Sequence, residues 1–365
     1  MKRITQTFIF ISILSSLILG FLHFNKKTLI FKSYDFNTKK QRTFNIETLD
    51  NSSNIHPKIG KHKAKDLVFY EISEKYLNTN LSPIKKTSEV FGTTNFFPSS
   101  TVVKAKSYFK GKEEGNFTAT LVSERFLLTA AHCVKGRSDE KLDSIIIFPL
   151  FENGKSNHNI NKIRIKRIYY PKDEENDVCN DIALLMVDLP IGNELGSVGL
   201  PSVNFVKSNL NIEKTLFRFS YPERSFASII EESNEARKNE INEDEYNRVK
   251  KNVKLRYSNT PQFDNSFQYF NNGLFQDNKI GHIEFRKLYS IAGRSGSAFL
   301  TSDYYALAIR SHDETISKSH KNEDGSIEHK ESPMTSFDCK LRGELLASFI
   351  HIIKENEHLL NLESI

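Results

Sequence analysis

The motif Thr129-Ala130-Ala131-His132-Cys133 (TAAHC) directly follows an apolar run, Phe126–Leu128, that is typical of a buried strand. It places a histidine at the end of a rigid element. Imidazole has an ordinary pKa of about 6.5, so it can accept and return a proton near neutral pH. His132 is therefore a candidate catalytic base, although a histidine after an apolar strand could equally be a core residue.

Two further motifs lie downstream of His132. Asp181 follows 49 residues later, in the segment Asn180–Leu185 (NDIALL). Ser295 follows Asp181 by 114 residues, in the glycine-containing segment Gly293–Ser297 (GRSGS). A serine hydroxyl becomes a useful nucleophile when a base within hydrogen-bond reach takes its proton, and a carboxylate can orient that base. Alone, Asp181 and Ser295 would be ordinary turn residues, but the ordered set predicts a nucleophilic triad.

The three motifs, in the order His, Asp, Ser, resemble those of the trypsin-like (chymotrypsin-fold) serine peptidases. The resemblance covers roughly residues 89–355. The serine motif GxSGS, with Ser297 where animal trypsins have glycine, is more similar to the bacterial glutamyl-endopeptidase branch. Two short segments, Val90–Thr93 (VFGT) and Ser220–Pro222 (SYP), resemble the same branch.

The resemblance implies a role for each residue. His132 is the general base, Asp181 holds its ring in the required tautomer, and Ser295 is the nucleophile. The backbone N–H groups of Gly293 and Ser295 form the oxyanion hole, and glycine suits that position because it tolerates unusual dihedral angles. The implied partner is a protein or peptide substrate, with no cofactor and no nucleic acid.

Alignment with the family places five further residues near the substrate. Tyr289 and Ser290 line the base and wall of the specificity pocket, and Ser311 lies beside the catalytic aspartate. Arg310 falls where the glutamate-preferring branch has a histidine, and a buried cation there would favour an acidic substrate side chain. We prefer the alternative that Arg310 points outward, or pairs with Asp313 or another nearby acid. Asp313 replaces a glycine of many relatives, and its side chain would crowd the pocket.

Two residues near Ser295 depart from the family pattern. Arg294 stands where animal trypsins have an aspartate, which pairs with a newly cut N-terminal amine. A guanidinium cannot make that pair, so activation by insertion of a new N-terminus is not expected, and the way in which the Gly293 turn is held stays open. Ala298 replaces a usual proline, which we interpret as a neutral packing change.

The remaining pattern indicates an all-β fold. Short apolar runs recur between turn signals, which is typical of a barrel or sandwich. These runs are Ser100–Lys104, Phe117–Val122, Phe126–Ala130, Ser144–Phe148, Asn161–Tyr169, Ile182–Val187 and Thr215–Phe219. The resemblance implies two six-stranded antiparallel barrels, the first over about residues 89–205 and the second over about 206–337, with the active site between them.

Two segments depart from the strand pattern. Residues 228–256 are densely charged and lack glycine and proline, so we expect a solvated helical insertion. Residues 340–356 predict an amphipathic C-terminal helix. Its apolar face consists of Leu341, Leu345, Phe349, Ile352 and Ile353. The peptidase domain as a whole is expected over residues 89–358.

The N-terminus predicts export. Lys2 and Arg3 precede the apolar run Phe8–Leu22, which is short for a bilayer span and suits a signal peptide within residues 1–24. If this run is not cleaved, it is a membrane anchor; a buried core segment is the third alternative. The chain is thus expected to be secreted or periplasmic. Residues 25–88 lack a sustained hydrophobic period, so we expect a linker or poorly packed pro-segment.

Cysteine usage and charge exclude several classes of protein. Three cysteines exclude a disulfide-dense mini-domain and show no metal-ligand spacing. The net charge of +6 is too small for its length to indicate nucleic-acid binding. In the family, the cysteine after the catalytic histidine pairs with a cysteine about sixteen residues upstream, which here is Phe117. We therefore expect Cys133 to be free and buried. Cys179 lies two residues before Asp181, and Cys339 lies just before the terminal helix, which packs near that loop in relatives, so the resemblance implies a Cys179–Cys339 disulfide.

The sequence therefore predicts an exported serine endopeptidase. The alternative is a catalytically silent trypsin-like binding protein at the cell surface. The complete set His132, Asp181 and Ser295 argues against the alternative, whereas Arg294 and Asp313 argue mildly for it.

Overall fold

The structure is a computed structural model. It describes residues 28–47, 51–67, 85–135, 141–172, 180–209, 214–222, 266–278, 282–285, 293–314, 317–321, 327–331 and 335–363. The apolar run Phe8–Leu22 and the charged segment 228–256 lie outside these residues. Among the described residues, no helix has both the length and the apolar character that a membrane crossing requires.

The first sheet contains the strand that precedes His132. In the described residues it has nine antiparallel strands, in the order β10-β7-β4-β5-β6-β12-β11-β1-β2. Their bounds are β1 Thr28–Asp35, β2 Lys40–Glu47, β4 Val102–Phe109, β5 Lys112–Leu121, β6 Phe126–Thr129, β7 Ser144–Phe148, β10 Ile163–Arg164, β11 Arg167–Pro171 and β12 Ala183–Met186. Branched and aromatic side chains of β4, β5, β7 and β12 fill its interior, which explains the recurrent apolar runs of the sequence.

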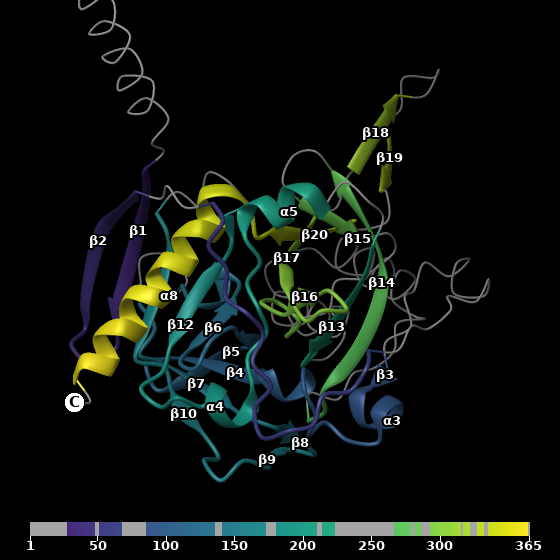
Figure 1. Cartoon of the computed structure of the whole chain (residues 1–365). Coiled ribbons are helices and arrows are strands. Elements are labelled where there is room, and N and C mark those ends of the chain that lie inside the picture. Colours follow the sequence, from purple (N-terminus) through teal and green to yellow (C-terminus); the bar gives the residue numbers. More distant parts are fainter. Residues whose placement is uncertain are drawn as a thin grey trace, which may run out of the picture.

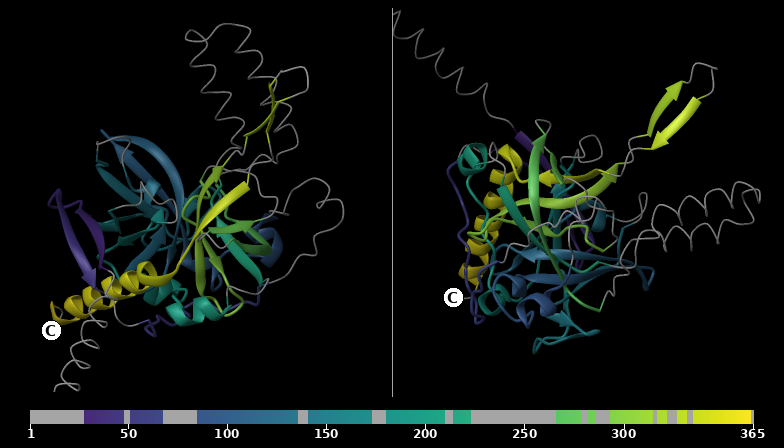
Figure 2. Two further views of the ribbon diagram at one scale, coloured as in Figure 1. Left: turned by 90° about the horizontal axis from the view of Figure 1, so that it is seen from above. Right: turned by 90° about the vertical axis from the view of Figure 1, so that its right-hand side faces the viewer.

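The second sheet carries the serine motif at one strand end. Its described strands run in the order β13-β16-β17-β20-β15-β14-β3, and β13 also pairs with β14. Their bounds are β3 Lys85–Lys86, β13 Lys214–Ser220, β14 Tyr269–Asn278, β15 His282–Phe285, β16 Ala298–Leu300, β17 Ala306–Glu314 and β20 Thr335–Lys340. A separate hairpin, β18 (Ser317–Lys321) and β19 (Ile327–Glu331), projects away from this sheet (Figures 1 and 2).

Short elements connect the strands. They are α3 Thr87–Phe91, η1 Ser99–Thr101, η2 Ala131–Cys133, β8 Phe151–Glu152, β9 Lys155–Ser156, α4 Gly192–Leu195 and α5 Val203–Asn209. The prediction of a mostly β chain is confirmed. The strand count of the prediction is corrected, because the described sheets have nine and seven strands rather than six each; the β1–β2 hairpin lies at one edge of the first and β3 at one edge of the second.

The predicted C-terminal helix is present, but its bounds of 340–356 are corrected: Lys340 is paired in the second sheet as the end of β20, so the helix begins later, and it also ends later. Helix α8 covers Gly343–Glu363 and lies across the first sheet beside the β1–β2 hairpin (Figure 1). The predicted apolar face is buried, and Leu341, Phe349 and Ile353 are completely inaccessible to solvent. Burial of this face docks α8 on the core that it shares with the second sheet.

The β1–β2 hairpin corrects the prediction of a poorly packed segment over residues 25–88. Strand β1 pairs with β11 over Phe31–Asp35, and Phe31 is fully buried. The Phe31 ring contacts Phe44 at a centroid distance of 6.1 Å and Phe349 of α8 at 5.6 Å. The sequence did not predict this packing, because β11, the strand that pairs with β1, lies far along the chain. That residues 25–88 serve as a pro-segment stays a prediction.

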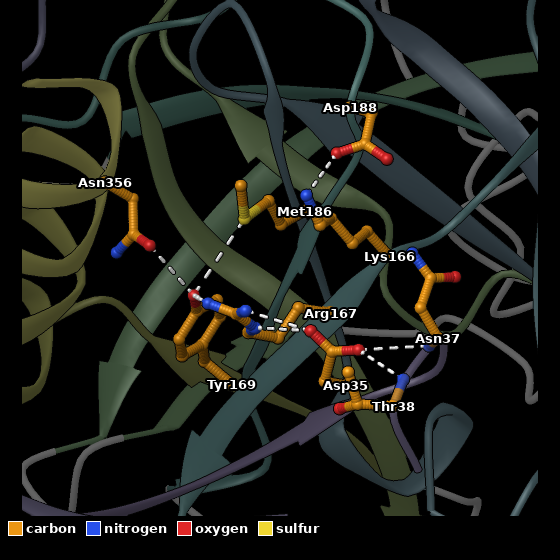
Figure 3. Close-up of polar contacts among 9 residues, drawn as sticks. All are labelled: Asp35, Asn37, Thr38, Lys166, Arg167, Tyr169, Met186, Asp188 and Asn356. Atoms are coloured by element: carbon orange, nitrogen blue, oxygen red, sulfur yellow. Dashed lines mark hydrogen bonds and ion pairs between the residues drawn. The ribbon is translucent and has the colours of Figure 1, made fainter. Parts of the chain in front are cut away.

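Polar contacts secure the same hairpin (Figure 3). The Arg167 guanidinium donates to Asp35 Oδ2 at 2.9 Å, and the backbone N–H of Thr38 donates to Asp35 Oδ1 at 2.9 Å. Burial alone would raise the pKa of Asp35, but these hydrogen bonds lower it below its usual value. Tyr169 Oη donates to Asn356 Oδ1 of α8 at 3.1 Å. The hairpin and the helix are thus parts of one folded body.

Phe31→Ala tests whether the hairpin belongs to the core. We expect the free energy of unfolding to fall by about 3–5 kcal/mol, because the substitution leaves a cavity between β2 and α8. Urea unfolding measures the change. Lys40→Ala, at an exposed position of the same hairpin, is the control and should change stability by less than about 0.5 kcal/mol. Equal effects of the two variants would show that the hairpin is not packed.

Candidate active site

His132 and Asp181 meet because their strands are antiparallel neighbours. Thr129 at the end of β6 pairs with Ala183 at the start of β12. Asp181 Oδ2 contacts His132 Nδ1 at 2.7 Å, and Asp181 Oδ1 accepts the backbone N–H of His132 at 2.8 Å. The carboxylate therefore fixes both the ring and the backbone of the histidine.

Asp181 also receives a hydrogen bond from the second sheet. Ser311 Oγ on β17 donates to Asp181 Oδ2, so Ser311 lies beside the aspartate as the sequence predicted. Burial would raise the pKa of Asp181, but the hydrogen bonds from His132 and Ser311 lower it below its usual value. The group is thus an ionised carboxylate at neutral pH.

The His132 ring has a thiol on its other side. Its Nε2 atom contacts Cys133 Sγ at 3.4 Å. Desolvation of the ring would lower its pKa, but the neighbouring Cys133 and Asp181 raise the pKa well above its ordinary value. The side chain is 46% exposed, so solvent and reagents can reach it.

The turn that carries Ser295 is tied to both sheets. Thr118 of β5 donates its side-chain hydroxyl to the Gly293 carbonyl at 2.8 Å and its backbone N–H to the Ser295 carbonyl at 3.0 Å. On the other side, the Gly296 N–H donates to the Arg310 carbonyl of β17 at 2.8 Å. The turn therefore lies at the boundary between the two sheets and is hydrogen-bonded to both.

Gly296 brings this turn against the strand that leads to His132. Its φ of +83° lies in the left-handed region. A Cβ atom there would lie 2.0 Å from Thr129 Oγ1 and 2.9 Å from the Ala130 nitrogen. Only glycine permits this approach, which places Ser295 beside the segment that bears His132.

The turn that bears Ser295 approaches the segment before His132, but the described side chains of these two residues share no direct hydrogen bond. Within the described residues, none joins Ser295 Oγ to His132 Nε2. Catalytic hydrogen bonds are often long in the absence of substrate and shorten in the complex. In the same part of the chain, the N–H groups of Gly293 and Ser295 have no acceptor, as an oxyanion hole requires.

The predicted substrate-binding residues are only partly described. Arg310 is 4% exposed and donates to Asp338 Oδ1, at the paired position of β20, at 3.2 Å. It therefore does not point outward but pairs with an acid. Tyr289 and Ser290 lie outside the described residues. Asp313 lies on β17, and its backbone is paired with Ser336 of β20. The structure does not describe the Asp313 side chain, so the predicted crowding of the pocket stays a prediction.

The cysteines differ in part from expectation. Cys133 makes no disulfide, as predicted, but it is only partly buried and contacts His132. Its family partner position is the buried Phe117. Cys339 is buried on β20, and because Cys179 lies outside the described residues, the Cys179–Cys339 disulfide stays a prediction. In the described part of the chain, no group of three or more His, Cys, Asp or Glu side chains could hold a metal.

Thr118 is a site residue that the sequence did not single out. It lies in a run of β-branched and apolar residues, where a threonine indicates only a strand. Its buried hydroxyl donates to the Gly293 carbonyl and accepts the Tyr221 N–H at 3.0 Å. No local sequence signal marks this long-range role.

Comparisons with known proteins agree on the fold family. The family model described as Trypsin matches residues 90–323, which is nearly two thirds of the chain. Venom serine protease 34 of Apis mellifera is 30% identical over 149 residues, which cover 38% of this chain and 36% of that protein. The match thus spans about a third of the venom protein's length.

Solved structures of proteases are similar at lower identity. A Glu endopeptidase in complex with MPD is 17% identical with a TM-score of 0.47, and the match covers 75% of this chain and 98% of that chain. The protease Anisep from Arthrobacter nicotinovorans is 12% identical with a TM-score of 0.45, over 69% and 94% of the two chains.

Gly296→Ala tests the close approach of the serine turn. We expect it to reduce the free energy of unfolding by at least about 2 kcal/mol more than Gly111→Ala, because only Gly296 adds a collision to the positive φ. Gly111, with φ +74° and open space around it, isolates the backbone cost. Chemical denaturation of both variants provides the comparison; equal losses would contradict the described contact.

The His132 titration tests its contact with Cys133. We expect an NMR titration midpoint above 6.5 that moves downward in Cys133→Ala, because the neighbouring thiol helps to raise the pKa. Since the folded pKa exceeds the unfolded value, protonated His132 stabilises the fold. This contribution is complete below about pH 6.5 and is lost as the pH rises through the folded pKa. A wild-type midpoint at or below 6.5 would contradict the contact.

Proposed function

The chain belongs to the trypsin family, and from this membership we propose that it is a serine endopeptidase with His132, Asp181 and Ser295 as its catalytic residues. The observation that carries the proposal is the close contact between Asp181 and His132 beside the turn that bears Ser295. This arrangement supplies a base, its orienting carboxylate and a nucleophile.

Acylation begins when Ser295 Oγ attacks the carbonyl carbon of the substrate peptide bond. His132 Nε2 accepts the hydroxyl proton, and the carbonyl oxygen gains the negative charge of the tetrahedral intermediate. The N–H groups of Gly293 and Ser295 stabilise that charge, and one such donor is typically worth about 10²- to 10³-fold in kcat. His132 then returns the proton to the leaving amine. Water repeats the sequence on the acyl-enzyme and releases the acid product.

Asp181 keeps His132 ready for this transfer. By accepting from Nδ1, it leaves Nε2 free of a proton in the neutral ring, and it stabilises the imidazolium that forms. Ser311 donates to the same carboxylate and restricts its position. For Nε2 to accept from Ser295, the Cys133 thiol has to rotate away from the ring, so substrate binding and a side-chain rotation precede acylation.

Arg310 has a structural role in this proposal. Asp338 is fully buried and already compensates the guanidinium charge. A second carboxylate from a substrate would compete with that pair, so we do not assign recognition of acidic side chains to Arg310.

Export remains part of the proposal. The basic residues Lys2 and Arg3 before the apolar run Phe8–Leu22 support a signal peptide, or an anchor if the run is retained. A secreted or periplasmic location suits a peptidase that acts on proteins outside the cytoplasm.

A catalytically silent binding protein is the second candidate. It is favoured by one observation: His132 Nε2 contacts Cys133 rather than Ser295. In that case the family fold would present a surface for a protein partner without turnover.

Labelling with a fluorophosphonate probe separates the two candidates. We expect the full-length chain to be labelled and Ser295→Ala to be unlabelled, because the probe reacts with a serine only when base and oxyanion hole are assembled. Asp181→Asn should label about 10⁴-fold more slowly, since the amide favours the wrong ring tautomer. Circular dichroism of each variant confirms folding. A folded wild-type chain that stays unlabelled would reject the peptidase in favour of the binding protein.

A further inference from the structure

A buried cationic cluster lies directly behind the serine turn. Arg294 precedes Ser295 in the chain and is completely buried, and Arg218 and Asn271 are each 1% exposed. Arg294 Nη2 donates to Asn271 Oδ1 at 2.7 Å, and Arg218 Nε donates to the same oxygen at 3.2 Å. Two guanidinium groups thus converge on one neutral amide oxygen.

The strands of the second sheet hold this cluster in place. Arg218 on β13 is paired with Asn271 of β14 on one side and with Phe299 of β16 on the other. Its guanidinium lies 4.6 Å from the centre of the Phe299 ring. The cluster is therefore built on sheet strands rather than on a surface loop.

The cluster offers hydrogen-bond donors without acceptors. Among the described residues, no acceptor lies within hydrogen-bond distance of Arg294 Nε, Arg294 Nη1 or Asn271 Nδ2. A guanidinium cannot lose its proton in a protein, so burial leaves Arg294 positively charged. A buried charge costs several kcal/mol unless an opposite charge compensates it. Arg310, by contrast, has the Asp338 carboxylate at 3.2 Å.

We propose that Arg294 and Asn271 bind a small anion, a halide or a carboxylate, in the second sheet. Such a ligand accepts from the unpartnered N–H groups on the edge of the cluster that it occupies and compensates the charge of Arg294; a water molecule would supply an acceptor but no charge.

Anion binding also fixes the turn that carries the nucleophile. The Arg294 carbonyl accepts both the backbone N–H of Ser297 at 3.0 Å and its hydroxyl at 2.7 Å, so the Arg294 backbone is part of the turn. Locking its side chain therefore holds the Gly293 and Ser295 N–H groups in place. This second consequence rests on the proposed function, whereas anion binding itself does not.

Thermal unfolding of the Ser295→Ala chain tests binding without self-cleavage. Chloride, and separately acetate, replaces a bulky sulfonate buffer anion at constant ionic strength. We expect the Tm to rise by about 5 °C at saturation, because a ligand that binds only the folded state stabilises it. If acetate raises the Tm at a lower concentration than chloride does, the site is a carboxylate site. If chloride acts at the lower concentration, it is a halide site.

Substitution of Arg294 assigns the effect to the cluster. Arg294→Gln in the same background should lose the anion-dependent rise and should unfold no earlier than its parent in anion-poor buffer, because it removes an uncompensated charge. Arg294→Met is the second variant in case the glutamine chain does not fold. Arg167→Gln is the matched control: Arg167 already pairs with Asp35, so its loss should leave the anion effect intact.

The result that would overturn the proposal is a Tm independent of both anions, or an equal rise in Arg294→Gln. Chloride NMR checks binding at constant temperature. The Ser295→Ala chain should broaden the chloride line, and the Arg294→Gln variant in the same background should not. The labelling rate of the wild-type chain should increase about tenfold over the same anion range. Failure of labelling at every anion concentration would reject the peptidase function, and the unfolding measurements would still decide whether the anion binds.

Discussion

The Asp181 carboxylate is the interaction on which the candidate site depends. It accepts the backbone N–H and the ring nitrogen of His132 from the first sheet and the hydroxyl of Ser311 from the second. Burial makes the ionised form costly, and these donors compensate that cost. The negative charge that orients the histidine is therefore sustained by contacts from both sheets, so the site exists only when the sheets are docked.

Hydrogen bonds from both sheets also position the turn that bears Ser295. Thr118 holds the Gly293 and Ser295 carbonyls from one sheet, and Arg310 accepts the Gly296 N–H from the other. Because Gly296 lacks a side chain, the turn can approach Thr129 closely. These contacts engage the Gly293 and Ser295 carbonyl groups; in the proposed mechanism, the N–H groups of the same two residues stabilise the oxyanion. The Arg294 side chain is completely buried behind the turn.

Local motifs predicted that His132 and Asp181 meet and that the chain ends in an amphipathic helix, but they did not predict long-range packing. TAAHC at the end of an apolar strand located His132, and the periodicity of Leu345 and Phe349 predicted α8. Phe31 lay in a stretch of polar composition, and its burial depends on pairing with β11 far along the chain. The contact of Cys133 with His132 was equally hidden, because it depends on a side-chain direction rather than on residue spacing.

We propose that His132 activates Ser295 and not Cys133, whose Sγ atom contacts the His132 ring. Trapping the acyl-enzyme tests it most directly: the full-length chain is mixed with an activated peptide ester, quenched in acid after one turnover, and mapped by peptide mass spectrometry. We expect an acyl group on Ser295 that is absent in His132→Ala and retained in Cys133→Ala. An acyl group on Cys133, or none on either residue in a folded chain, would contradict it.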